Sequence, residues 1–415
     1  MTRILFVAGV LALLAACNDH TIKVCDITQS DCQRDIYYAD LHLRGDGYDP
    51  FAGIPPIRTI SEDQYRQELQ ADAAKAAAEA AAQNQPPPPP WAGQALVLLG
   101  LLPSTGDTQG ESIDNQVQNV AAYYSNETKD VTVVAHPELN TDPASNMETL
   151  AHELVHALQD REINLNIASN QSTDEYFTSK ALIEGDATFY GLLFRYEIPP
   201  PAGKQFIYPN PLAYLAAMRD GMMSDQGSDD FASLGPPYFA VPWLVYPLGG
   251  FWYATRWTEG GNSAVRHSYA SAPKRSLDYL LGPDVTAPAS ASISCYPAVP
   301  IAFTSSGNAY AVDSLGAAFF FGYLMGWKVP AADSLSSAKL WRYDLLFYYY
   351  NQSTQKTAVV WRIELGSPLA DSVLATLNTP TGPRVVQTGT TLMITASDDP
   401  TLLTTWNPGI TCPAQ

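Results

Sequence analysis

Charge, histidine and long apolar stretches are all scarce in this sequence. Only 16% of its 415 residues are charged, and the 42 acidic residues outnumber the 23 basic ones, which gives a formal net charge of −19. Such a negative field repels nucleic acid and anionic lipid headgroups, so neither is an expected partner. The 46% apolar content is still enough for a large core, which argues against a disordered chain.

Beyond the first 17 residues, no apolar run is long enough to cross a membrane, because charges, prolines or glycines interrupt each one. The start, MTRILFVAGVLALLAAC, has one arginine and then an apolar stretch too short for a normal span. It resembles the lipobox of bacterial lipoproteins; a plain secretory signal is the alternative. We predict a signal peptide at residues 1–16 and a lipid on Cys17, which would hold an exported protein at the bacterial cell envelope, on the outer membrane or the cell surface.

Cysteine is rare as well, with five residues in the whole chain. If Cys17 carries lipid, an even number remains, as is typical of disulfides in an oxidising compartment. Among three possible pairings we favour Cys25 with Cys32, which closes a small loop, and Cys295 with Cys412, which would tie the tail to the body. No CxxC spacing occurs, so zinc binding by the cysteines is the less favoured alternative.

The pattern of turn formers and helix formers divides the mature chain into three segments. Residues 17–60 are rich in turn formers, and we expect an irregular lead-in. Residues 61–300 form the predicted main domain, with a helix that begins after Ser61 and a hairpin that turns at SNETKD. Residues 301–415 form an α/β extension packed on it, with a helix followed by a hairpin. The fold class we expect is α+β and mainly helical.

Two of only six histidines lie in ETLAHELVHALQD. His152 and His156 are four residues apart, so on a helix their side chains lie one above the other. A helix is predicted because apolar residues recur at helical spacing across residues 147–158. Asp142, followed by proline, fits the start of this helix, and Ser145 offers an alternative start.

Two imidazoles one helical turn apart can bind the same metal ion, each through one nitrogen. Glu153, one residue round from His152, can reach a water molecule at that ion without being a ligand. This is the HExxH pattern, in which zinc makes a water molecule more acidic and the glutamate takes its proton. We therefore expect Zn²⁺ as the cofactor and Glu153 as the catalytic residue. An amphipathic helix with incidental polar residues is the alternative.

A catalytic zinc site needs a third protein ligand and keeps its fourth position for water. A third histidine six residues after His156 is missing, because Glu162 stands there. The segment ALIEGDATFYG supplies Glu184 among apolar residues at helical spacing, and we assign it as the third ligand. Gly185 beside it costs about 1 kcal/mol in a helix relative to alanine. A metal site packed next to the first helix would explain that glycine.

Other polar residues compete for roles around this site. Asp174 and Glu175 are expected in a polar loop, NQSTDEY, which would place them poorly. Asp186 is about 200° round the helix from Glu184, so both cannot face one ion. It is left either to orient a histidine from behind or to lie on the surface. Four side chains remain open as the group that stabilises the oxyanion of a hydrolytic reaction: Tyr190, Tyr246, His267 and Tyr269.

The segments LAHELVHALQD and ALIEGDATFYG resemble a family of secreted or surface-anchored zincin-like metallopeptidases of bacteria and archaea. The resemblance covers most of residues 60–377. It implies a zincin-like fold and a gluzincin-type site, with His152, His156 and Glu184 on zinc and Glu153 as general base. The implied function is zinc-dependent hydrolysis of peptide bonds in a peptide or protein substrate. The alternative is a non-catalytic zinc-binding surface protein that uses the same scaffold for adhesion or assembly.

Overall fold

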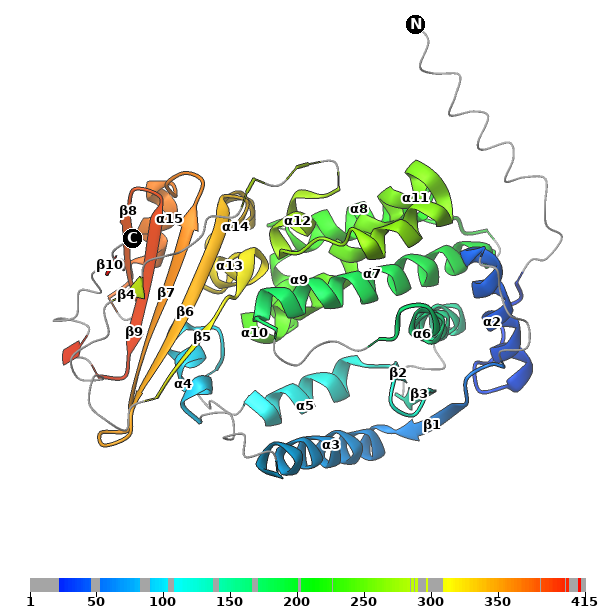
Figure 1. Ribbon diagram of the computed structural model, residues 1–415. Helices are drawn as coiled ribbons and strands as arrows, with labels where there is room; N and C mark the ends of the chain where they lie inside the picture. The colour runs from blue at the N-terminus through cyan, green and yellow to red at the C-terminus, as the bar shows by residue number, and fades with distance from the viewer. Residues whose placement is uncertain are drawn as a thin grey trace, which may run out of the picture.

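The computed structural model describes residues 22–45, 53–82, 90–103, 108–136, 142–165, 171–200, 203–225, 227–283, 285–286, 288–289, 296–297, 309–380, 382–399, 401–402 and 410–411. These residues form a mainly helical α+β structure, as predicted (Figure 1). The predicted signal peptide, the lipidation site Cys17 and the pair Cys295 and Cys412 lie outside the described residues.

The helices, in chain order, are α2 (Ser30–Arg44), α3 (Glu62–Ala82), α4 (Pro90–Leu99), α5 (Thr108–Asn119), α6 (Pro143–Ile163), α7 (Thr173–Glu197), α8 (Pro211–Met222), α9 (Ser228–Ser233), α10 (Pro237–Ala240), the 3₁₀ helix η2 (Val241–Leu244), α11 (Val245–Ala270), α12 (Ser276–Leu281), α13 (Gly316–Gly326), α14 (Ala331–Ala338) and α15 (Asp371–Leu377). The strands are β1 (Ile57–Ser61), β2 (Ala122–Ser125), β3 (Asp130–Ala135), β4 (Tyr296–Pro297), β5 (Ala309–Asp313), β6 (Trp341–Asn351), β7 (Lys356–Leu365), β8 (Arg384–Thr388), β9 (Thr391–Ser397) and β10 (Ile410–Thr411).

The N-terminal segment contradicts the irregular lead-in that we expected over residues 17–60, because α2 and β1 both lie within it. The buried residues of α2 include Ile36, Tyr37 and Leu41, which recur at helical spacing among polar residues. Gly45, with a φ of 60°, adopts the left-handed conformation that ends many helices. Gly45, one of the turn formers that suggested an irregular segment, therefore ends a helix that we did not predict.

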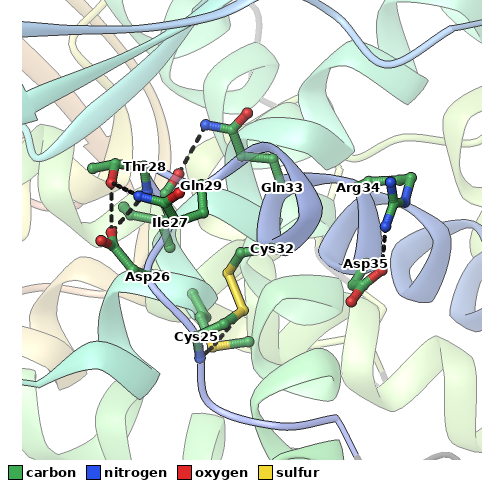
Figure 2. The surroundings of a disulfide bond; sticks show 10 residues. Cys25, Asp26, Ile27, Thr28, Gln29, Cys32, Gln33, Arg34 and Asp35 are labelled. Carbon is green, nitrogen blue, oxygen red and sulfur yellow. Dashed lines mark hydrogen bonds and ion pairs between the residues drawn. A yellow bond between two sulfur atoms is a disulfide. The ribbon is translucent and has the colours of Figure 1, made fainter.

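The predicted disulfide between Cys25 and Cys32 is confirmed. The sulfur atoms are 2.02 Å apart, and the Cα atoms are 5.7 Å apart. Figure 2 shows the bond, which joins the residues before α2 to its first turn. Cys32 is buried in a small apolar cluster that also contains residues of α2, α6 and β3. The bond therefore holds the start of α2 against the body of the protein.

A three-stranded sheet in the order β1-β3-β2 lies beside α6. The predicted hairpin at SNETKD is confirmed, since β2 ends at Ser125 and the antiparallel β3 begins at Asp130. β1 pairs in parallel with the other side of β3. Within the described residues, β2 is therefore an edge strand of this sheet, and it contacts the helix that carries HELVH.

The long helices α6, α7 and α11 form the helical layer, with α7 packed between the other two (Figure 1). A Cβ atom on Gly185 of α7 would lie 2.4 Å from the backbone carbon of Gly249 in α11. Gly185 thus allows α7 to approach α11, and our attribution of this glycine to packing against the HELVH helix is wrong. Among the described helices, none has both the length and the apolarity needed to span a membrane.

The C-terminal region forms an antiparallel sheet in the order β5-β6-β7-β9-β8, with α13 packed near it (Figure 1). The predicted helix and hairpin are both present, and the hairpin turns between Asn351 and Lys356. One apolar cluster runs from Phe189 and Leu192 of α7, through Phe320 of α13, to the sheet. The extension therefore shares its core with the helical layer.

Strands β4 and β10 pair so that Thr411 lies opposite Tyr296. These residues are the sequence neighbours of Cys412 and Cys295, so the pairing brings together the two segments that our second disulfide would join. We expect a proteolytic digest under non-reducing conditions to contain one pair of peptides linked through Cys295 and Cys412. Mass spectrometry before and after reduction should show this linked pair and then its two separate peptides. Recovery of both cysteines as free thiols in oxidised protein would contradict this pairing.

Candidate metal centre

Local sequence accounts for the start of α6. The side chain of Asp142 accepts hydrogen bonds from the backbone N–H groups of Ala144 and Ser145, each at 3.2 Å, and Pro143 occupies the first turn. The preferred start is therefore confirmed over the alternative at Ser145. The helix then carries His152, Glu153 and His156 into the body of the protein.

The start of α7 corrects one expectation. Ser172 caps this helix in a capping box with Glu175, so Asp174 and Glu175 lie in the first helical turn and not in a loop. Asp174 is buried and accepts hydrogen bonds from the backbone and hydroxyl of Ser276. Glu175 thus stabilises the start of α7 and Asp174 holds α7 to α12, which leaves Glu184 as the carboxylate of α7 that faces the two histidines.

Three side-chain atoms form a nearly equilateral triangle between α6 and α7. The Nε2 atoms of His152 and His156 are 3.1 Å apart, and the Oε2 atom of Glu184 is 3.2 Å from each of them. The rings of the two histidines are nearly perpendicular, at 86°. The side chains are 15%, 9% and 10% exposed, respectively, so the triangle is largely screened from bulk water.

This triangle fits a divalent metal ion. Ligand atoms at about 2.0–2.1 Å from a tetrahedral ion lie about 3.3–3.4 Å apart, close to the separations observed here. Two imidazole nitrogens and one carboxylate oxygen are also a donor set that such ions favour. Glu153 lies within 4.8 Å of both imidazoles, and the group His152, Glu153 and His156 could itself hold an ion. We give more weight to Glu184, because its oxygen is equally near to both histidines.

Electrostatics also favour a cation here. Burial raises the pKa of Glu184, but Lys180 and His156 outweigh it and hold this pKa well below its ordinary value. Lys180 Nζ lies 3.0 Å from the second carboxylate oxygen, Oε1, and so leaves Oε2 for the triangle. Burial alone would lower the pKa of His156, but the charge of Glu184 raises it to about 9. The site is one in which a positive charge is stabilised.

Glu153 lines the same cleft as residues 122–124 of β2. The backbone of Tyr124 in β2 lies close enough to favour the ionised form of Glu153. Burial raises the pKa of Glu153 above its ordinary value, although His152 and His156 oppose the change. A carboxylate with this environment can accept a proton more readily than an exposed one.

The triangle lines a cleft of about 1230 Å³ between the helical layer and the β-hairpin. Of the four side chains left open for the oxyanion, Tyr246 lines this cleft, and its ring is 5.9 Å from that of His152. The others have different roles: Tyr190 donates to Asn262, Tyr269 donates to a buried carboxylate, and His267 bonds a backbone carbonyl within its own helix.

Gln159, Lys180 and Arg44 belong to the centre but were not predicted from the sequence, whereas Asp186 was predicted either to support a histidine or to lie on the surface. Gln159 holds the far nitrogen of His156, and its spacing of three residues on the same helix was an available signal. Lys180, one turn before Glu184, was equally visible. Asp186 is fully buried and bonds Gln159, so it is not a surface charge. Arg44, which pairs with Asp186, lies too far away in the sequence to be found by spacing.

No protein-family model, curated protein or solved structure matches this chain. Its function is therefore inferred from the geometry of the centre and from the motifs in the sequence.

Proposed function

We propose that this protein is a zinc-dependent peptidase of the bacterial cell envelope, anchored through a lipid on Cys17. The observation that carries the proposal is the triangle of His152, His156 and Glu184 in the wall of a large cleft, with Glu153 beside it. Two histidines and a glutamate make a catalytic set, whereas structural zinc sites are closed by four protein ligands. The resemblance of HELVH and ALIEGDATFYG to zincin-like gluzincins supports the same assignment.

The chemistry follows from where the side chains lie. Zinc held by the triangle would supply Lewis acidity to a carbonyl and to water in the cleft. Glu153, which lines the cleft, accepts a proton from the attacking water and returns it to the leaving amine. Burial raises the pKa of Tyr246 well above its ordinary value, so its hydroxyl remains a donor for the developing oxyanion.

The cleft also suggests how a substrate would bind. The edge strand β2 contributes residues 122–124 to the cleft wall, next to Glu153. An extended peptide could align with this strand by backbone hydrogen bonds. Aromatic residues on other walls, including Tyr176, Tyr214 and Trp243, offer apolar surface to its side chains. These features favour an unfolded or extended polypeptide as the substrate.

Metal removal tests this proposal. We expect the purified protein to contain about one zinc per chain and to cleave casein or a peptide library, with cleavage lost after chelation and restored by zinc. A His156→Ala variant should bind zinc more weakly and show no restoration. If the wild type binds zinc but cleaves nothing in these screens, the rival surface-protein function is favoured and the peptidase proposal fails.

A further inference from the structure

Behind His156, on the side away from Glu184, a buried amide fixes the orientation of the imidazole. His156 Nδ1 is 2.8 Å from Gln159 Oε1. Gln159 Nε2 donates to Asp186 Oδ2 at 2.8 Å and to the carbonyl of Ile183 at 2.9 Å. It also donates to the hydroxyl oxygen of Tyr269 at 3.1 Å. Because all three neighbours on that side accept hydrogen bonds, the oxygen of the amide must face His156. The imidazole therefore donates from Nδ1, which leaves Nε2 as the nitrogen that would give up its proton and bind a metal ion.

This arrangement depends on the position of Asp186, which is buried. Its side chain has no exposed surface, and an isolated carboxylate there would be costly. Arg44 Nη1 lies 2.7 Å from Asp186 Oδ2, and the hydroxyl of Tyr269 donates to the same oxygen at 2.5 Å. Arg44 is itself only 2% exposed, stacks over the ring of Tyr190, and also pairs with Glu162.

We propose that helix α2 completes the metal centre, with its last residue, Arg44, as a positioning residue for His156. The connection runs from the Arg44 guanidinium to Asp186, from Asp186 to the Gln159 amide, and from that amide to His156 Nδ1. None of the three supporting residues reaches the triangle itself. The inference rests on the proposed metal site and not on peptide hydrolysis.

Loss of the Arg44 charge has a defined consequence. Asp186 would then be a buried carboxylate without its cation, and its side chain would no longer be held beside Gln159. Loss of this acceptor leaves Gln159 Nε2 with the Ile183 carbonyl and the Tyr269 hydroxyl alone, so the amide is held less firmly and can turn its NH₂ group toward His156. An imidazole that accepts at Nδ1 carries its proton on Nε2, the atom that must bind the metal. Metal affinity should fall although every ligand remains in place.

The test is zinc affinity of the mature full-length protein, measured by competition with a chromophoric chelator. Arg44→Met keeps the length of the side chain but removes its charge, and we expect zinc to bind about 10- to 100-fold more weakly. Arg44→Lys should recover most of this loss by restoring the cation. Gln159→Leu, which leaves the pair between Arg44 and Asp186 intact, should weaken zinc binding to a similar extent as Arg44→Met.

Arg161 supplies a matched control. It lies on α6 and anchors the same N-terminal segment, through Tyr37 of α2 at 2.6 Å and the carbonyl of Gly53 at 2.8 Å, but does not contact Asp186. Arg161→Met should leave zinc affinity within about threefold of wild type. An equal loss in both arginine variants would mean that α2 acts only as packing, and this would overturn the proposal.

Two further outcomes separate this inference from the proposed function. Unchanged zinc affinity in Gln159→Leu would refute the inference while leaving a zinc peptidase intact, and this variant decides the matter if Arg44→Met does not fold. A wild-type protein that binds zinc without cleaving peptides would refute the peptidase, yet the loss of zinc affinity in Arg44→Met would still support the role of α2. Thermal unfolding of each metal-free variant identifies those that are folded.

Discussion

Replacement of Glu153 by glutamine is expected to abolish hydrolysis while the protein keeps its metal. Glutamine has nearly the same shape as glutamate and fits the same buried position, but it cannot take a proton from water. The rate should fall by about 10³-fold or more, the upper range for loss of a general base. Cleavage of a fluorogenic peptide gives the rate, and elemental analysis gives the zinc content of both proteins.

Glu127→Gln is the matched control for this variant. Glu127 lies in the turn of the β2–β3 hairpin and pairs on the surface with Lys75 at 3.3 Å. The same chemical change there should leave both cleavage and zinc content at wild-type values. If Glu153→Gln cleaves peptides as fast as the wild type, Glu153 is not the base, and the mechanism proposed for this centre is wrong.

The parts of the centre that the sequence could predict are those set by local spacing. The position of the two histidines and Glu153 on one helix follows from apolar periodicity, an Asp–Pro start and a four-residue spacing. Glu184 lies on the next long helix, and its neighbours also show helical periodicity. The structure places its oxygen 3.2 Å from both imidazoles, as the assigned role requires.

What the sequence could not predict depends on contacts between distant segments. Arg44 and Asp186 meet only because α2 packs across α6 and α7. The contact between Gly185 and Gly249 of α11 could not be predicted either, because nothing near Gly185 in the sequence identifies its partner. The start of α7 was missed for a different reason: NQSTDEY is polar like a loop, yet its Ser172 and Glu175 form the capping box of a helix.

The C-terminal extension is expected to melt together with the metal centre, and Asp344 is the residue that shows why. Its buried carboxylate accepts hydrogen bonds from the backbone N–H groups of Leu315 and Gly316, and from the indoles of Trp341 and Trp361. The hydroxyl of Ser314 donates a fifth bond, at 2.9 Å. One side chain of β6 therefore fixes the start of α13 against the sheet.

The same junction holds the first turn of α7. The backbone N–H of Asp174 donates to the carbonyl of Ser314 at 2.9 Å, and the N–H of Thr173 donates to the carboxylate of Asp313, also at 2.9 Å. Because Glu184 lies on α7, the helix that supplies the third corner of the triangle is anchored to the sheet through these residues. Loss of order at residues 313–316 should therefore spread into the metal centre.

Asp344→Ala is expected to destabilise the protein by about 4 kcal/mol or more, because it leaves two indoles and two backbone N–H groups buried without an acceptor. The melting temperature should fall by more than about 5 °C in a single transition, followed by circular dichroism and, in zinc-loaded protein, by zinc release to a chelating dye. Asp333→Ala, on the exposed side of α14, is the control and should melt within about 2 °C of wild type. Two separate transitions, with zinc release unchanged in Asp344→Ala, would show that the extension and the metal centre unfold independently.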